Sequence, residues 1–167
     1  WEERHGAVRE EFARDWSGGT AYRGQNSNMH LTEALVAAFE ATGDRSYLIK
    51  AERIAELIIG RHAASLDWCV AEHFDDGWTI DRNCAGSDMF RPAGTTPGHW
   101  LEWSRLLLQL WELGGRTQDW LPDAAAKLFR SAIARGWDTR TGGFFYTLNF
   151  DHTPRLTHKI WWPVTEA

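Results

Sequence analysis

Two similar units, each containing a pair of helices, constrain the fold of this sequence most. Each unit begins with a polar loop, followed by an amphipathic helix, a glycine-containing turn, a second helix and a strand-like segment. The expected helices cover residues 29–42, 45–62, 97–113 and 121–136. Short connections make such helices antiparallel, and repeated hairpins bury their apolar faces against one another. The pattern therefore predicts an all-α toroid or solenoid.

Matching positions in the two units carry the same short motif. His30 and Glu33 stand near the start of the first helix of one unit, and His99 and Glu102 near the start of the first helix of the other. In a toroid, the loops at one end of the inner helices form a cup. We expect His30 and His99 to point into that cup.

Local signals predict the remaining elements. Three large apolar residues about four positions apart predict an amphipathic helix over residues 2–16: Val8, Phe12 and Trp16. Asn28 and Asp44 are expected to be N-caps. Strand-like runs cover 68–74 and 142–148, and a last helix is expected from about Lys159. Between them lies a long polar loop that includes Asp88; a loop of this length is usually functional.

The strongest candidate for chemistry is the start of the helix at residue 97. Thr96 suits the N-cap, and Pro97 suits the first helical position. His99 and Glu102 are three residues apart, so both side chains leave one face of the helix. An imidazole beside a carboxylate can transfer protons near neutral pH. The structural alternative is a capping histidine next to a surface carboxylate.

A second group precedes the first unit. The amide of Asn26 can donate and accept hydrogen bonds, which suits sugar hydroxyls, and His30 follows one turn later. For Asn28, loop and cap chemistry is the preferred interpretation. The two His-x-x-Glu motifs could supply four metal ligands, but di-iron bundles use the reverse order, Glu-x-x-His. We expect no metal and no cofactor.

Other titratable residues allow further interpretations. Glu72 and His73 alternate in direction on the strand-like run, so one of them can face the cup. A carboxylate pair such as Glu72 and Glu102 would suit glycoside hydrolysis. His5 and His62 are expected at the surface.

Composition narrows the class of partner. The chain has 11 Trp among 167 residues, which fits either a Trp-rich core or an aromatic-lined carbohydrate pocket. A net charge of −5 disfavours nucleic acid and anionic membranes. No apolar run is long enough to span a bilayer. Cys69 and Cys84 form no disulfide framework, so we expect buried free thiols and a cytoplasmic location.

Three segments resemble the N-acylglucosamine 2-epimerase superfamily: residues 23–30, 97–103 and 159–166. The first two are most similar to its aldose–ketose isomerase branch, which contains the mannose isomerases and sulfoquinovose isomerases. The resemblance covers nearly the whole chain. It implies an (α/α)6 barrel and a metal-independent proton transfer at C1 and C2 of a sugar, through a cis-enediol.

The resemblance also implies roles for particular residues. His99 would be one of two catalytic histidines acting as acid and base, and Glu102 its catalytic or substrate-binding neighbour. Five residues would bind substrate: Asn26, His30, Arg91, Trp162 and Glu166. The family places its second catalytic histidine beyond the last motif, outside this sequence, and His158 does not replace it. The family's N-terminal helices, with a further substrate-binding Arg, are also outside it.

We therefore expect residues 1–167 to form a single partial barrel domain, truncated at both ends. The expected function is a cytoplasmic sugar isomerase acting on a mannose-like monosaccharide, with the oligomeric state open. Three alternatives remain: an N-acylglucosamine or cellobiose 2-epimerase, a glycoside hydrolase of toroid fold, and a sugar-binding fragment without activity.

Overall fold

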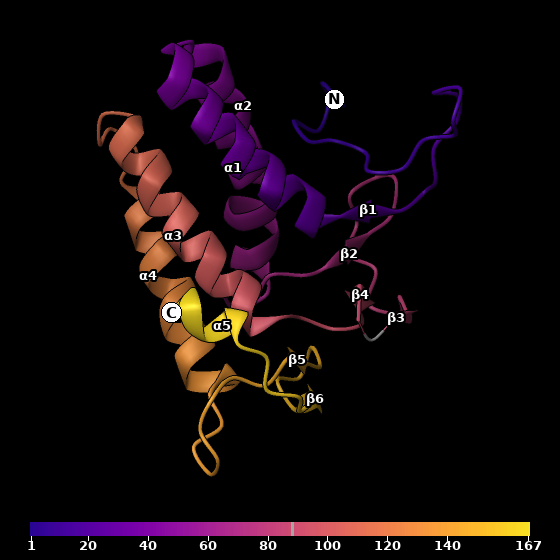
Figure 1. Cartoon of the computed structure of the whole chain (residues 1–167), viewed down its shortest axis with the longest axis vertical. Helices are drawn as coiled ribbons and strands as arrows, with labels where there is room; N and C mark the ends of the chain where they lie inside the picture. The colour runs from indigo at the N-terminus through magenta and orange to yellow at the C-terminus, as the bar shows by residue number, and fades with distance from the viewer. Residues whose placement is uncertain (88) are drawn as a thin grey trace.

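Two antiparallel helical hairpins form the body of the protein (Figure 1). The computed structural model describes residues 1–87 and 89–167. The long helices are α1 (Gln25–Thr42), α2 (Arg45–Ala55), α3 (Pro97–Leu113) and α4 (Trp120–Ser131). Two π-helical segments extend α2 and α4: η1 (Glu56–Ala63) and η2 (Ala132–Gly136). Helix α1 packs on α2 and α3 on α4, and α3 joins the hairpins by contacting both α1 and α2.

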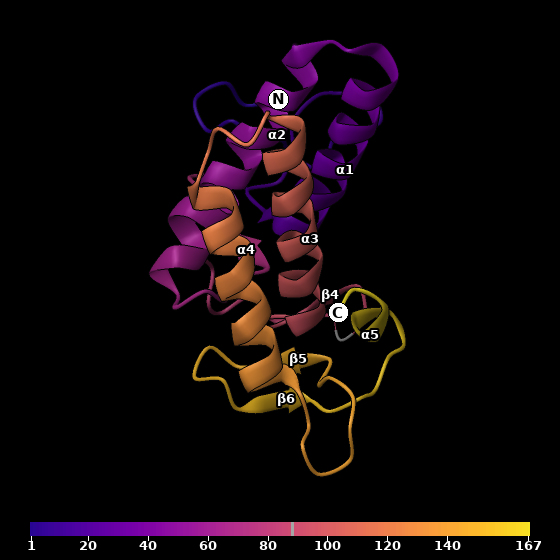
Figure 2. The same ribbon diagram turned by 90° about the vertical axis from the view of Figure 1, so that its left-hand side faces the viewer.

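Short strands and loops gather at the N-terminal ends of α1 and α3 (Figure 1). The strands are β1 (Arg23–Gly24), β2 (His73–Phe74), β3 (Gly86–Ser87), β4 (Arg91–Pro92), β5 (Thr147–Leu148) and β6 (Pro154–Leu156). They pair antiparallel as β1–β2, β3–β4 and β5–β6. A final short helix, α5 (Trp162–Thr165), packs on α3. Figure 2 shows α3 and α4 side by side, with β5, β6 and α5 toward one end.

Thr95 ties the loops together immediately before α3. Its backbone bridges Ala71 on one side and Leu148 on the other, and it exchanges two 2.9 Å hydrogen bonds with Leu148. Gly94 permits this approach: its φ is +92°, and a Cβ there would lie 2.1 Å from the carbonyl oxygen of Leu148. The start of α3 is thereby fixed relative to two other loops.

The hydrophobic core lies between the two hairpins. The helices predicted over 29–42, 45–62, 97–113 and 121–136 are all present, with small shifts at their ends. Five apolar residues of α2 and η1 are buried in the core: Leu48, Ala51, Ile54, Ala55 and Ile58. Trp100 and Trp103 of α3 are buried as well. Asp44 caps α2 by accepting from the Ser46 N–H at 2.9 Å, and Gly43 ends α1 with φ of +73°.

Among the described residues, no helix combines the length and apolar character needed to cross a bilayer.

The predicted helix over residues 2–16 is wrong. The segment holds an isolated bridge between Glu2 and Ala7, and Trp16 has a left-handed φ of +64° and is 81% exposed. Tertiary partners replace helical hydrogen bonds here. The carboxylate of Glu2 accepts from Arg23 at 2.9 Å, and the Val8 N–H donates to Asn28 Oδ1 at 2.9 Å. Spacing alone did not reveal these partners.

Several smaller expectations also differ from the structure. Asn28 is not an N-cap: α1 begins at Gln25, and the buried Asn28 amide also donates to Val8 and Gly24 carbonyls. His62 is buried against Phe74 rather than exposed, and burial lowers its pKa to about 4.

Other boundaries shift as well. The strand-like runs shrink to β2 and β5, and the last helix begins at Trp162 rather than near Lys159. Both cysteines are free, but only Cys69 is fully buried. The predicted polar-loop residue Asp88 lies outside the described residues.

The Glu2–Arg23 pair predicts acid-sensitive docking of the N-terminal segment. Hydrogen bonds from Arg23 hold the pKa of Glu2 at about 2, against an ordinary 4.5. The stabilisation is therefore present above pH 4.5 and is lost as the pH falls toward 2. We expect Glu2→Gln to weaken docking by about 2 kcal/mol at neutral pH.

Hydrogen exchange of the residue 2–10 amides in the two proteins measures this effect. Glu3→Gln is the matched control, since Glu3 makes an exposed pair with Arg53. Equal protection of the segment in the wild type and Glu2→Gln would contradict the account.

Candidate active site

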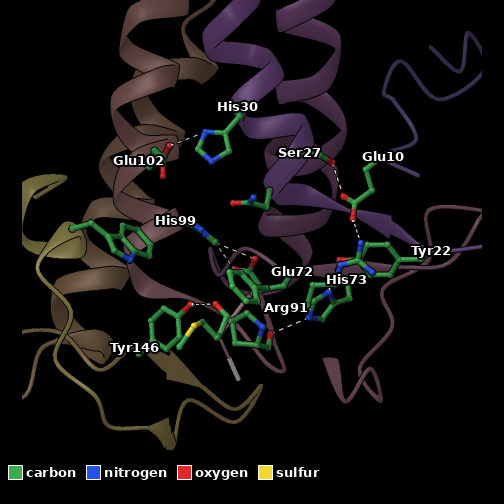
Figure 3. Close-up of a pocket in the computed structure, with 15 residues that line it drawn as sticks. Glu10, Tyr22, Ser27, His30, Glu72, His73, Arg91, His99, Glu102 and Tyr146 are labelled. Atoms are coloured by element: carbon green, nitrogen blue, oxygen red, sulfur yellow. Dashed lines mark hydrogen bonds and ion pairs between the residues drawn. The ribbon is translucent and has the colours of Figure 1, made fainter. Parts of the chain in front are cut away.

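A cavity of about 460 Å³ opens where the loops meet the N-terminal ends of α1 and α3 (Figure 3). Six of the seven residues predicted for the site line it: Asn26, His30, Arg91, His99, Glu102 and Trp162. They come from α1, β4, α3 and α5. Glu166 is not part of the lining; it lies on the other side of Arg105.

A buried chain of hydrogen bonds orients His99 from behind. Its Nδ1 lies 2.9 Å from Oε1 of Glu72, a carboxylate only 4% exposed. Gln25 donates from Nε2 to Glu72 Oε2 at 3.0 Å, and Trp103 donates from its indole to Gln25 Oε1 at 2.8 Å. The chain links α1, the loop entering β2, and α3.

This chain determines which nitrogen of His99 can act as a base. A carboxylate only accepts hydrogen bonds, so we assign the proton to Nδ1, and Nε2 is left as the nitrogen that can accept a proton. Among the described residues no hydrogen bond engages Nε2. A neutral imidazole in this tautomer can accept a proton at Nε2 while Glu72 stabilises the resulting cation.

The electrostatics of the pair favour that role. Burial lowers the pKa of His99, but the charge of Glu72 and its hydrogen bond outweigh burial, with a smaller contribution from Glu102. The net effect raises the pKa of His99. Burial likewise raises the pKa of Glu72, but His99 and Gln25 outweigh it and the pKa falls. Glu72 is therefore ionised at neutral pH.

Trp162 covers one face of His99. The two rings stack with centroids 5.2 Å apart and planes 30° from parallel. Gly98 makes room for this contact, because a Cβ there would lie 2.3 Å from the indole ring. The glycine in the Pro97-Gly98-His99 sequence thus lets α5 close against the start of α3.

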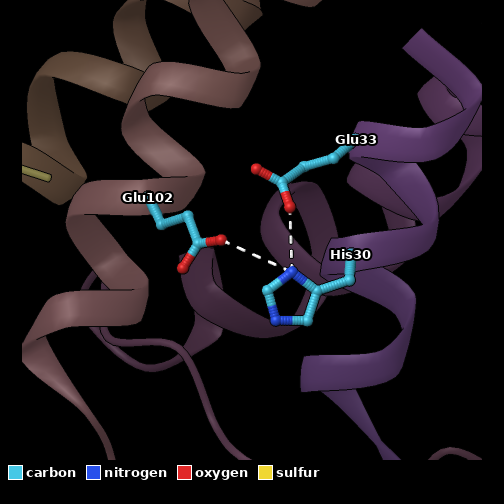
Figure 4. A group of neighbouring side chains, drawn as sticks. All are labelled: His30, Glu33 and Glu102. Atoms are coloured by element: carbon cyan, nitrogen blue, oxygen red, sulfur yellow. Dashed lines mark hydrogen bonds and ion pairs between the residues drawn. The ribbon is translucent and has the colours of Figure 1, made fainter. Parts of the chain in front are cut away.

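His30, Glu33 and Glu102 point toward one another from α1 and α3 (Figure 4). His30 Nδ1 lies 2.8 Å from Glu33 Oε2 and 3.7 Å from Glu102 Oε1. Glu102 is 6% exposed, and burial raises its pKa although His99 and His30 oppose this effect. A raised pKa makes this carboxyl group easier to protonate than an ordinary glutamate, which suits a group that exchanges protons with a ligand.

Among the residues that the structure describes, these three form a group whose ligand atoms lie close enough together to hold a metal ion. Their atoms would supply one nitrogen and two carboxylate oxygens, a donor set compatible with a divalent cation. Arg105, however, donates to the other oxygen of Glu33 at 2.8 Å and also to Glu166 at 3.1 Å. The guanidinium already supplies positive charge there, so the geometry favours a charged network over a metal centre.

The lining of the cavity also contains residues that sequence reasoning missed, among them Tyr22 and Glu10. Tyr22 donates to Nδ1 of His73 at 2.8 Å, because Nε2 of His73 donates to the carbonyl of Pro92 at 2.9 Å. Arg91 lies over the Tyr22 ring and pairs with Glu10. Strand alternation identified Glu72 and His73 only as alternatives, yet both line the cavity. Gln25 and Glu10 gave no sequence signal of their own.

The Glu72–His99 contact predicts a measurable titration. Replacing Glu72 with Gln removes the charge that raises the pKa of His99, so burial dominates and the pKa of His99 falls. Nuclear magnetic resonance of labelled histidine rings across pH 4–9 would follow it. Glu112→Gln, at the far end of α3, is the matched control. An unchanged His99 titration in Glu72→Gln would refute the assignment.

Comparison with known proteins identifies the family. A sequence model of the N-acylglucosamine 2-epimerase (GlcNAc 2-epimerase) family matches residues 1–167. D-mannose isomerases of Pseudomonas cannabina pv. alisalensis and Thermobifida fusca are each 43% identical over the whole chain, which spans 42% of either relative. The chain thus covers less than half the length of these relatives.

A solved structure agrees. A crystal structure of D-mannose isomerase superposes on 99% of this chain with a TM-score of 0.91 and 38% identity, and the chain covers 43% of it. The two hairpins therefore form part of an (α/α)6 barrel, as the sequence predicted. The chain belongs to the N-acylglucosamine 2-epimerase family.

Proposed function

We propose that the natural protein is an aldose–ketose isomerase that interconverts mannose and fructose. The observation that carries the proposal is His99, which lines the cavity while its Nδ1 lies 2.9 Å from Oε1 of Glu72. The similarity to D-mannose isomerases supports the choice of sugar. The cavity volume of about 460 Å³ suits a small ligand.

The proposed reaction moves protons between two carbons and two oxygens. His99 Nε2 takes the proton from C2 of the open-chain aldose while O1 gains a proton, which gives a cis-enediol. Delivery of a proton to C1 and loss of the O2 proton then give the ketose. Glu102, with its raised pKa, exchanges protons with O1 and O2. No metal or cofactor takes part in this scheme.

The remaining residues are proposed to hold the sugar. Asn26 and His30 offer polar groups to its hydroxyls from one face of α1, and Arg91 from β4. Trp162 supplies an aromatic surface beside His99. Glu166 acts indirectly, through Arg105, which also binds Glu33 beside His30.

The domain and its location complete the proposal. We propose that residues 1–167 supply one part of a cytoplasmic barrel enzyme and that the second catalytic histidine comes from outside this chain. An epimerase of the same family would use the same first proton abstraction but return the proton to the opposite face of C2. Fructose as product supports isomerisation, and a C2 epimer alone supports epimerisation.

Replacing His99 tests the proposal directly. We expect His99→Ala in the intact natural protein to slow formation of fructose from mannose by about 10²–10⁴-fold, the usual contribution of a general acid–base. Chromatography of timed reactions measures the rate. His158→Ala is the control, since His158 is exposed and outside the cavity. A His99→Ala protein with the wild-type rate would refute the proposed role.

A further inference from the structure

Glu10 brings a carboxylate from the N-terminal segment into the cavity beside Arg91 (Figure 3). Its Oε1 lies 2.8 Å from Nη2 of Arg91, and its Oε2 accepts from the Ser27 hydroxyl at 2.7 Å. Glu11 pairs with the same guanidinium nitrogen. Arg91 also lies over Tyr22, 4.3 Å from the ring centroid. The side chain of Glu10 is only 15% exposed.

The surrounding backbone holds Glu10 in this position. Asn28 both donates to and accepts from the backbone of Val8, two residues before Glu10. Glu2, at the start of the segment, is bound by Arg23. Gly24 leaves the necessary space, because a Cβ there would lie 2.5 Å from Oε2 of Glu10. The carboxylate is therefore built into the wall of the cavity.

The charges in the cavity have a consequence for the ligand. Arg91 is the one Lys or Arg side chain among the described residues that line the cavity. Two carboxylates, Glu10 and Glu11, already pair with it, and Glu72 and Glu102 line the same cavity. A phosphate or sulfonate on the sugar would meet a guanidinium whose charge two carboxylates at Nη2 already balance, and it would lie near like charges. An uncharged hydroxyl can still hydrogen-bond to either partner of the pair.

We propose that Glu10 is a specificity-determining residue, which makes the cavity select uncharged sugars and reject sugars that carry a phosphate or sulfonate group. The inference rests on the proposed function for the identity of the uncharged sugar. The discrimination is electrostatic, because Glu10 forms an ion pair with Arg91, the cation that would otherwise bind an anionic group. Removing its charge while keeping its shape leaves Arg91 partly unpaired and available to an anionic group.

Binding measurements separate this inference from the question of turnover. Calorimetry on the intact natural protein would compare mannose with mannose 6-phosphate in the wild type, Glu10→Gln and Glu3→Gln. The last variant removes the same charge far from the cavity, where Glu3 pairs with Arg53. We expect the wild type and Glu3→Gln to bind mannose about tenfold or more tightly than mannose 6-phosphate. In Glu10→Gln we expect this ratio of affinities to fall by about tenfold.

The outcomes are distinct from those of the isomerase proposal, because affinity is read whether or not mannose is converted. A wild type that binds mannose 6-phosphate as well as mannose, or binds neither sugar, overturns the inference. An unchanged preference in folded Glu10→Gln also overturns it.

If Glu10→Gln does not fold, the inference is tested instead by the salt dependence of the two sugar affinities of the wild type. Screening of like charges should strengthen mannose 6-phosphate binding relative to mannose as ionic strength rises. A constant or falling relative affinity overturns the inference.

Discussion

The hydrogen bond between Glu72 and His99 is the contact on which the site depends. A buried carboxylate is costly unless it is paired and hydrogen-bonded, and Glu72 receives both His99 and Gln25. Gln25 is itself held by the indole of Trp103. Because these residues come from both hairpins and the loop between them, the contact that orients the imidazole also joins α1 to α3. Packing and proposed chemistry therefore share the same atoms.

The loops around this pair are fixed by equally specific contacts. Thr95 connects the start of α3 to two other loops, and Gly94 and Gly98 remove the side chains that would prevent close approach. One wall of the cavity is built by α5, which places Trp162 on His99, and another by the N-terminal segment, which places Glu10 on Arg91. The cavity thus draws on segments from both ends of the chain.

The sequence predicted the parts of the structure that depend on local periodicity. Helix α3 and the entry of His30 and His99 into one cavity follow from helical spacing and from the repeated motif. The partner of His99 could not be predicted, since Glu72 lies 27 residues away, next to a strand that pairs with β1. The N-terminal segment was mistaken for a helix because its hydrogen-bond partners, Arg23 and Asn28, are tertiary ones. The predicted place of Glu166 in the site stays a prediction, since it lies behind Arg105.

In the proposed mechanism, Nε2 of His99 faces the reacting carbons of a bound sugar. The decisive measurement is a crystal structure of the intact natural protein with mannitol, an open-chain analogue of mannose. We expect mannitol in this cavity, with the oxygens on C1 or C2 within hydrogen-bonding distance of His99 Nε2 and with Nδ1 still on Glu72. Mannitol bound elsewhere, or with both oxygens turned away from His99, would contradict it.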